Sequence, residues 1–223
     1  MKNLLLTVIF LFLSVLAIAQ KEINTEFATK MNLAFQPLEK NRVPFGLLKD
    51  QAFEFTELAA YNGVVTDTNY VTPVTIKQIY NTLLSARIHD NASQFIQPDV
   101  YEQRWQANRT QGVITLSGLL FNYAQFKTDA VTSGKLQVIN NQFVDKYIGG
   151  TWQNPYDTKQ TFAIAPSVRK YKGYTFSIKI PSNLWLTNVT ETIQSIQIDA
   201  NDGLGYRTTT FGQNLSVAYN SSG

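Results

Sequence analysis

The side chains that could do chemistry in this chain are few and poorly combined. His89 is the only histidine and there is no cysteine. A Ser–His–Asp site would need His89, but Ser117 lacks the G-x-S-x-G pattern that presents a nucleophile on a sharp turn. His89 follows an expected helix, where a solvated histidine is common. A zinc site would need mostly carboxylates, which is unusual. We therefore name no catalytic or cofactor-binding residue, and the sequence favours a non-enzymatic role.

The segment Asp199-Ala200-Asn201-Asp202-Gly203 alternates oxygen ligands before a glycine, as calcium loops do. Its glycine comes one residue early, however, and the distal bidentate glutamate is missing. A hairpin turn that needs positive φ at Gly203 explains the same residues. Asp199 and Asp202 are thus weak candidates for a structural Ca²⁺, and the turn is the favoured interpretation.

Aromatic side chains suggest another kind of site. If this were a carbohydrate-binding β-sandwich, sugar rings could stack on Trp105, Trp152 and Trp185, with Tyr156, and Trp152 and Tyr156 are the candidates named for such a site. Packing of such rings in the core is more common. Glycoside hydrolysis would need a pair of carboxylates, and no spacing singles one out. The acidic residues considered for it are Glu54, Glu57, Asp99, Glu102, Asp145, Asp157 and Glu191.

Residues 1–19 have the order of a cleavable signal peptide. Lys2 supplies the positive start, Leu4 to Leu16 is almost wholly apolar, and Ala17-Ile18-Ala19 offers small residues for cleavage. The apolar run is shorter than the roughly 20 residues that span a bilayer, and no later run could serve as a stop-transfer helix. We expect cleavage after Ala19 and a secreted or cell-surface product with no transmembrane span.

Two helices are expected ahead of the β-rich part of the chain. Thr72 and Pro73 form a start signal, and the apolar spacing over Val74 to Ile88 predicts an amphipathic helix. Asp99 and Glu102 resemble a capping box and predict a shorter helix from Asp99. A weaker helical spacing lies within residues 20–42 and ends at Pro37. Asn62-Gly63 between apolar residues predicts a hairpin.

From Gly112 onward the apolar period changes to two, which predicts short strands separated by polar turns. The chain should therefore be mainly β (α+β), with an antiparallel β-sandwich-like domain at residues 112–223 preceded by a mixed helix and strand segment at residues 20–111. The expected strands are 113–116, 119–126, 136–139, 161–165, 174–180, 193–198, 206–210 and 215–219. The expected turns include Ser133-Gly134, Asn140-Asn141, Gly149-Gly150 and Asp202-Gly203. Polar turn residues after the last strand suggest a domain truncated at its C-terminal end.

Composition narrows the class of partner. Hydrophobic residues make up 44% of the chain and charged residues 16%, so a folded core is expected without disulfides. The formal net charge of +3 falls by one when Lys2 is removed with the signal peptide. Only Arg169, Lys170 and Lys172 cluster, and a nucleic-acid site would need a denser basic patch.

Four segments of the chain form a recognisable pattern: residues 43–48 (Val-Pro-Phe-Gly-Leu-Leu), 61–63 (Tyr-Asn-Gly), 154–156 (Asn-Pro-Tyr) and 198–206, the last from Ile198-Asp199 to Gly203-Leu204-Gly205-Tyr206. This pattern resembles the N-terminal region of large secreted proteins of the Bacteroidetes type, which are commonly cargo of type IX secretion. The resemblance implies a scaffold or binding module, and some relatives are expected to carry an α/β-hydrolase domain further along.

The leading hypothesis is a non-catalytic scaffold or binding module of a secreted bacterial protein. One alternative is an accessory domain of an exported esterase-like or lipase-like hydrolase, and another is a carbohydrate-binding β-sandwich. The expected partners are accordingly a polysaccharide or a downstream domain of the same polypeptide.

Overall fold

A computed structural model describes residues 26–88, 95–191 and 193–220. The expected signal peptide at residues 1–19 and His89 lie outside the described residues. The described residues divide into two compact units, of which unit 1 comprises residues 26–39 and 128–155, and unit 2 comprises those described within 40–127 and 156–220. The expected boundary near residue 111 falls inside unit 2, where residues from both sides of it share one core.

Helix α2 of unit 2 spans Pro73–Ser85 and begins as expected. The Thr72 hydroxyl accepts a hydrogen bond from the Thr75 amide at 3.1 Å, and Pro73 occupies the first turn, where its missing N–H costs nothing. Ile76, Ile79 and Leu83 form the buried face. The helix ends three residues before the expected Ile88.

Helix α3 spans Pro98–Ala107, and the expected capping box of Asp99 and Glu102 is wrong. Gln97 is the N-cap and makes no side-chain capping bond, because Pro98 rather than Asp99 is the first helical residue. Glu102 instead forms an ion pair with Lys77 of α2. Glu102 therefore joins α3 to α2 and does not take part in capping α3.

The main sheet of unit 2 is built around strand β1, Val113–Phe126. Strand β6, Tyr156–Pro166, runs antiparallel to β1 over eleven residue pairs, and the sheet order is β11-β7-β1-β6. Strands β7 (Thr175–Lys179) and β8 (Trp185–Thr187) pair in parallel with β1, and β11 (Leu215–Ala218) pairs antiparallel with β7. Strand β8 follows a short 3₁₀ turn, η5, at Ser182–Leu184.

Beyond β8, other groups pair with the outer edge of β1. The Asn188 side chain accepts from the Asn122 amide and donates to its carbonyl, both at 2.7 Å, and so imitates one more residue of strand pairing. Further along, the Ala124 amide donates to Leu47 and the Phe126 amide donates to the Asp50 carboxylate, each at 2.8 Å. The long strand is therefore stabilised along both edges.

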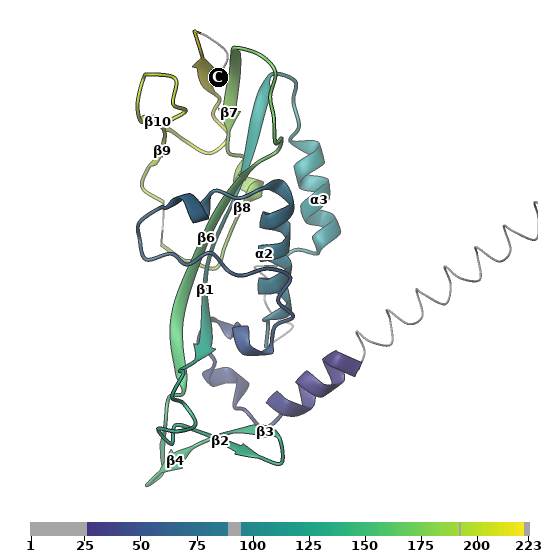
Figure 1. Cartoon of the computed structure of the whole chain (residues 1–223), viewed down its shortest axis with the longest axis vertical. Coiled ribbons are helices and arrows are strands. Elements are labelled where there is room, and N and C mark those ends of the chain that lie inside the picture. Colours follow the sequence, from purple (N-terminus) through teal and green to yellow (C-terminus); the bar gives the residue numbers. More distant parts are fainter. Residues whose placement is uncertain (1–25, 89–94, 192, 221–223) are drawn as a thin grey trace, which may run out of the picture. The chain divides into compact units, whose positions relative to one another are not determined.

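Two different layers cover the faces of this sheet, as Figure 1 shows. Helices α2 and α3 lie on one face, where Leu119 and Phe121 of β1 join their core. A ribbon of β9 (Ile196–Ile198) and β10 (Arg207–Thr209) lies on the other side of β1 and β6. The Arg207 side chain ties this ribbon to β11 through a 2.7 Å bond to the Ser216 carbonyl.

Unit 1 contains a helix at residues 26–35 and two hairpins. The hairpins are β2 (Leu136–Ile139) with β3 (Gln142–Asp145) and β4 (Tyr147–Ile148) with β5 (Thr151–Trp152). Their turns are the expected Asn140-Asn141 and Gly149-Gly150, all four residues having positive φ. The buried Asp145 carboxylate accepts bonds from the Glu39 amide at 2.6 Å and the Trp152 indole at 2.7 Å.

The fold class is confirmed: the chain is mainly β (α+β), most strand pairs are antiparallel, and a smaller segment with one clear amphipathic helix precedes the sandwich-like sheet packing. The expected hairpin at Asn62-Gly63 is wrong, because its flanks form only isolated bridges to β6 through Ala60 and Tyr70. The two strands expected at 113–126 are one, since Gly118 is paired on both sides. Within the described residues, no helix is long and apolar enough to cross a membrane.

Candidate functional site

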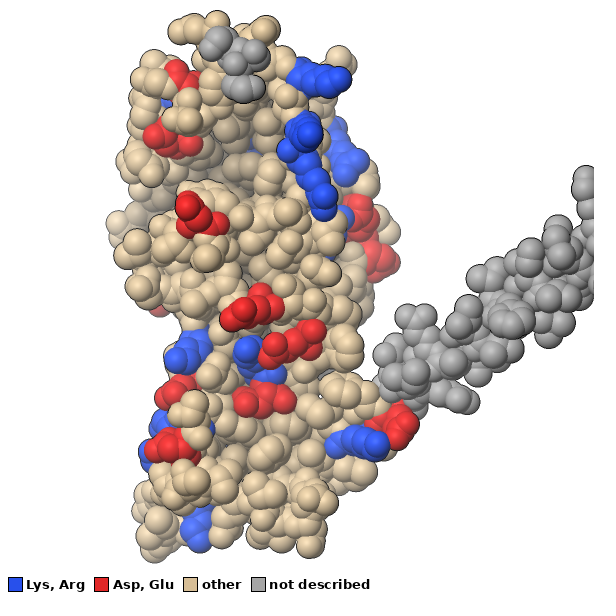
Figure 2. All heavy atoms as spheres, viewed as in Figure 1, with Lys and Arg blue, Asp and Glu red and all other residues tan. Residues whose placement is uncertain are grey.

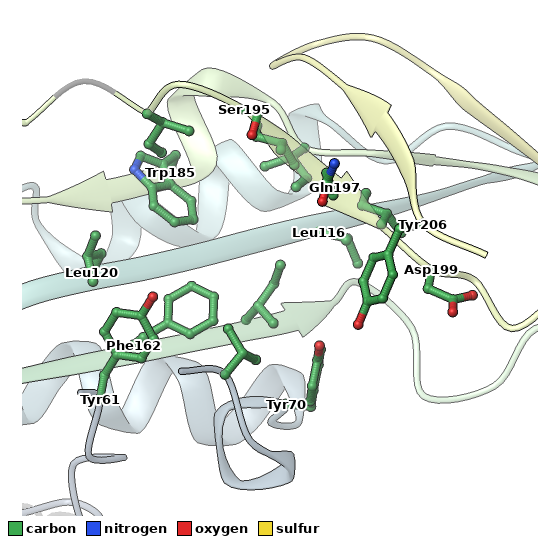
Figure 3. Close-up of a pocket in the computed structure, with 16 residues that line it drawn as sticks. Tyr61, Tyr70, Leu116, Leu120, Phe162, Trp185, Ser195, Gln197, Asp199 and Tyr206 are labelled. Atoms are coloured by element: carbon green, nitrogen blue, oxygen red, sulfur yellow. The ribbon is translucent and has the colours of Figure 1, made fainter. Parts of the chain in front are cut away.

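The candidate site is a pocket of about 370 Å³ in unit 2, between the main sheet and the β9–β10 ribbon (Figure 3). This volume is at the lower end of the range of roughly 300–1,000 Å³ that is typical of small-molecule sites. Its lining comprises Tyr61, Val65, Tyr70, Leu116, Leu120, Phe162, Ile164, Ile180, Trp185, Ile193, Ser195, Ile196, Gln197, Ile198, Asp199 and Tyr206.

The alternation of side chains along β1 and β6 makes the sheet side of the pocket apolar. In β1, Leu119 and Phe121 point into the helix-covered core, so Leu116 and Leu120 point to the opposite face. In β6, Phe162 and Ile164 share that face, and Phe162 is paired with Leu120. One strand pair thus contributes to the core on one face and to the pocket on the other.

Trp185 of β8 reaches the pocket because its partner in β1 has no side chain. Gly118 pairs with Trp185, and a Cβ at Gly118 would lie 2.4 Å from the Cζ3 atom of the indole. The Trp185 ring lies 6.2 Å from that of Phe162, whose other neighbour is Tyr61 at 5.2 Å, measured between centroids. Gly118 therefore makes room for an aromatic wall that continues from Trp185 to Tyr61.

The segment that carries Tyr61 and Tyr70 is hydrogen-bonded along the edge of β6. The Tyr61 amide donates to Gln160 at 3.0 Å, and the Val71 amide donates to Ile164 at 2.9 Å. Between them the buried Asn69 side chain donates to the Phe162 carbonyl at 2.9 Å and accepts from the Thr66 amide at 2.8 Å. These bonds hold Tyr70 at the rim of the pocket with its side chain 64% exposed.

The opposite rim is the loop between β9 and β10, which carries Asp199 and Tyr206. Figure 3 shows the Tyr206 ring directed toward Tyr70, with the Asp199 carboxylate beside it. Tyr206 is 73% exposed and Asp199 is also exposed. The Asp199 carboxylate accepts the Asn201 amide at 2.7 Å, which shapes the turn. Among the sixteen described lining residues, Asp199 alone carries a formal charge at neutral pH.

Of the two expected calcium ligands, Asp202 has a different partner. Its side chain is fully buried and forms a 2.6 Å bond with the Arg207 guanidinium, so the charge is already neutralised. Gly203 has positive φ, as the favoured hairpin-turn interpretation requires, and Asn201 has positive φ as well. Within the described residues, no three His, Cys, Asp or Glu side chains gather where they could hold a metal ion.

Of the four aromatic residues considered for sugar stacking, Trp105 is buried in the core and Trp185 lines the pocket. The expectation for Tyr156 is wrong, because the residue is only 3% exposed and its ring stacks on Phe126 at 5.5 Å, which leaves no open face for a ligand. Trp152 is half-buried in unit 1 and its indole N–H donates to Asp145. Two of the acidic residues considered for glycoside hydrolysis have structural partners: Asp145 accepts hydrogen bonds from Glu39 and Trp152, and Glu102 forms an ion pair with Lys77.

The pocket was not predicted, although one signal for it is present in the sequence. Leu119, Leu120 and Phe121 place apolar side chains on both faces of β1, which indicates a sheet covered on both sides. Asp199 was considered for a cation site, and the structure places it at the pocket rim instead of in a calcium loop.

Comparisons with protein-family models, with curated proteins and with solved structures give no match for this chain.

Proposed function

We propose that this chain is an exported, non-catalytic binding module whose ligand site is the pocket between the main sheet and the β9–β10 ribbon. The observation that carries the proposal is the pocket itself, in which an apolar interior meets a few polar groups at the rim. This combination is characteristic of small-molecule binding sites, where apolar surface supplies affinity and a few polar groups supply orientation.

The export part of the proposal is supported by residues 1–19, with their charged start, apolar run and small cleavage residues. It is further supported by the resemblance to the N-terminal region of secreted type IX cargo. The full chain should be produced in a bacterial host and its mature N-terminus sequenced. We expect Gln20 as the first residue of an exported product; an intact Met1 on cytosolic protein would contradict export.

The binding part can be tested with N-phenyl-1-naphthylamine, an uncharged apolar dye that fluoresces when it leaves water. We expect saturable binding to the wild-type chain and an affinity about fivefold lower when Tyr70 and Tyr206 are both changed to alanine, because two exposed rings are removed from the rim. Both side chains are largely exposed, so the double variant should fold.

Tyr174→Ala is the matched control, since Tyr174 is 55% exposed and is not part of the pocket lining. It should bind the dye as the wild type does. The proposal fails if the dye does not bind saturably, or if Tyr174→Ala and the double rim variant weaken binding equally.

A further inference from the structure

The charge and the aromatic rings at the pocket rim identify a ligand class, and this inference rests on the proposed function. The interior side of the pocket is aliphatic and aromatic, with Leu116, Leu120, Ile164 and Trp185 among its residues. Such a surface accepts an apolar group and gains from its removal from water. A ligand that fills this space needs an apolar body.

The rim differs from the interior in that it combines two tyrosine rings with a carboxylate. In Figure 3 the hydroxyl ends of Tyr70 and Tyr206 point toward each other from opposite sides of the rim, and Asp199 lies beside Tyr206. The phenolic oxygens are acceptors with partial negative charge, and the faces of the two exposed rings also attract cations. The negative charge of the Asp199 carboxylate next to them also attracts a cation.

Nearby charges leave the negative potential of Asp199 in place. Asp202 and Arg207 neutralise each other, so residues 199–207 retain one net negative charge, that of Asp199. Asp199 has no Lys or Arg within ion-pair distance among the described residues. In Figure 2, the upper left of the view, where β9 and β10 lie, carries more red than blue side chains.

We propose that the pocket binds an organic cation with an apolar tail. The cationic head, an ammonium or quaternary ammonium group, lies between Tyr70 and Tyr206 against the Asp199 carboxylate. The tail lies along the face of β1 and β6 formed by Leu116, Leu120 and Phe162. Charge complementarity selects this ligand class, because an anionic head would meet Asp199 with no compensating positive charge in the lining.

Calorimetric titration with three probes of equal chain length tests this proposal: octyltrimethylammonium, 1-octanol and octanoate. On the wild-type chain we expect the cation to bind about tenfold more tightly than the alcohol and the anion to bind most weakly. The preference for the cation should decrease as salt is raised, since the rim is exposed to solvent.

Asp199→Asn should reduce the affinity for the cation about threefold, a modest loss because the contact between the carboxylate and the cationic head is exposed to solvent. The affinity for 1-octanol should not change, because the asparagine amide keeps the oxygen that accepts the Asn201 N–H and so preserves the turn. Asp199→Lys should reverse the order and favour octanoate. The matched control is Asp129→Asn, an exposed carboxylate of unit 1 outside the pocket, which should change none of the affinities.

The outcomes separate this inference from the proposed function. If all three probes bind equally and Asp199→Asn changes nothing, the cation proposal is overturned while pocket binding stands. If no probe binds, and the uncharged dye also fails, both are overturned. Tighter binding of octanoate than of octyltrimethylammonium to the wild type would likewise refute the cation proposal.

Discussion

At the scale of single residues, Gly118 decides whether the pocket has its aromatic wall. The residue is in ordinary extended backbone, so its importance does not come from a special φ angle. It comes from the Trp185 ring, which occupies the space that a Cβ would need, with two ring carbons at 2.4 and 2.5 Å. A glycine inside a strand often marks such a close approach.

Gly118→Ala should therefore lower the free energy of unfolding by about 1–3 kcal/mol, the usual cost of overpacking a well-filled site. The same substitution should weaken dye binding, because Trp185 must move. Urea unfolding of the variant and of Gly118→Ala combined with Trp185→Ala provides the test. Removal of the indole should relieve most of the loss caused by alanine at 118, and additive losses would contradict the packing argument.

Tyr101 is a second residue whose environment has a measurable consequence. Burial raises the pKa of its hydroxyl to about 12. Since the Ser117 hydroxyl donates to the Leu184 carbonyl at 2.8 Å, Tyr101 is the donor in its own 2.8 Å bond to Ser117. This chain of bonds joins α3, β1 and η5, and it requires a neutral tyrosine.

Because the folded pKa of Tyr101 lies above the unfolded value of about 10, its contribution to stability is complete below pH 10 and is lost as pH rises toward 12. The free energy of unfolding should fall more steeply in this range by up to about 1.4 kcal/mol per pH unit on account of Tyr101. Tyr101→Phe, compared by urea unfolding at pH 8, 10 and 11, should show the smaller decline. Equal slopes would refute this assignment.

At the scale of elements, α2 and α3 are joined by the ion pair of Lys77 and Glu102. The bond from Lys77, followed by the one from Gln106, lowers the pKa of the Glu102 carboxyl. Lys77 also lies over the Trp105 ring, 5.6 Å from its centroid. The side chains of Lys77 and Glu102 are 34% and 41% exposed, so solvent screening limits what the pair contributes.

A lowered folded pKa means that the stabilisation from Glu102 is present above the unfolded value of about 4.5 and is lost as pH falls through the folded value. Between pH 7 and pH 3.5, Glu102→Gln should lose less stability than the wild type, by no more than about 1 kcal/mol. Glu191→Gln, at an exposed position, is the control and should follow the wild type. A wild-type pH dependence in Glu102→Gln would contradict the prediction.

The elements also show which features a sequence reveals. The start of α2 and the turns at Asn140-Asn141 and Gly149-Gly150 were predictable, because capping and positive φ depend on neighbouring residues. Strand β8 was missed because its three residues pair with β1 more than sixty positions away. At Asn62-Gly63, the local turn signal was overridden by pairing of the flanking residues with β6.

At the scale of the whole molecule, unit 2 is held together without disulfides by a sheet that packs on both faces. One face is filled by α2 and α3, whereas the other is only partly filled by the β9–β10 ribbon and leaves the pocket. The sequence could indicate that both faces of β1 are apolar. It could not indicate the space between layers, which depends on the register of β1 with β6 and on the position of the ribbon.

The most direct test of the pocket as a binding site is a two-dimensional NMR titration of the indole N–H signals with 1-octanol. The three tryptophans report on separate places, since Trp185 lines the pocket, Trp105 is buried in the helix-side core and Trp152 belongs to unit 1. Tryptophan-to-phenylalanine variants assign the signals. The predicted result is a saturable shift of the Trp185 signal with little change in the other two. A Trp185 signal that stays fixed while Trp152 shifts, or no saturable shift at all, would contradict the assignment of this pocket as the ligand site.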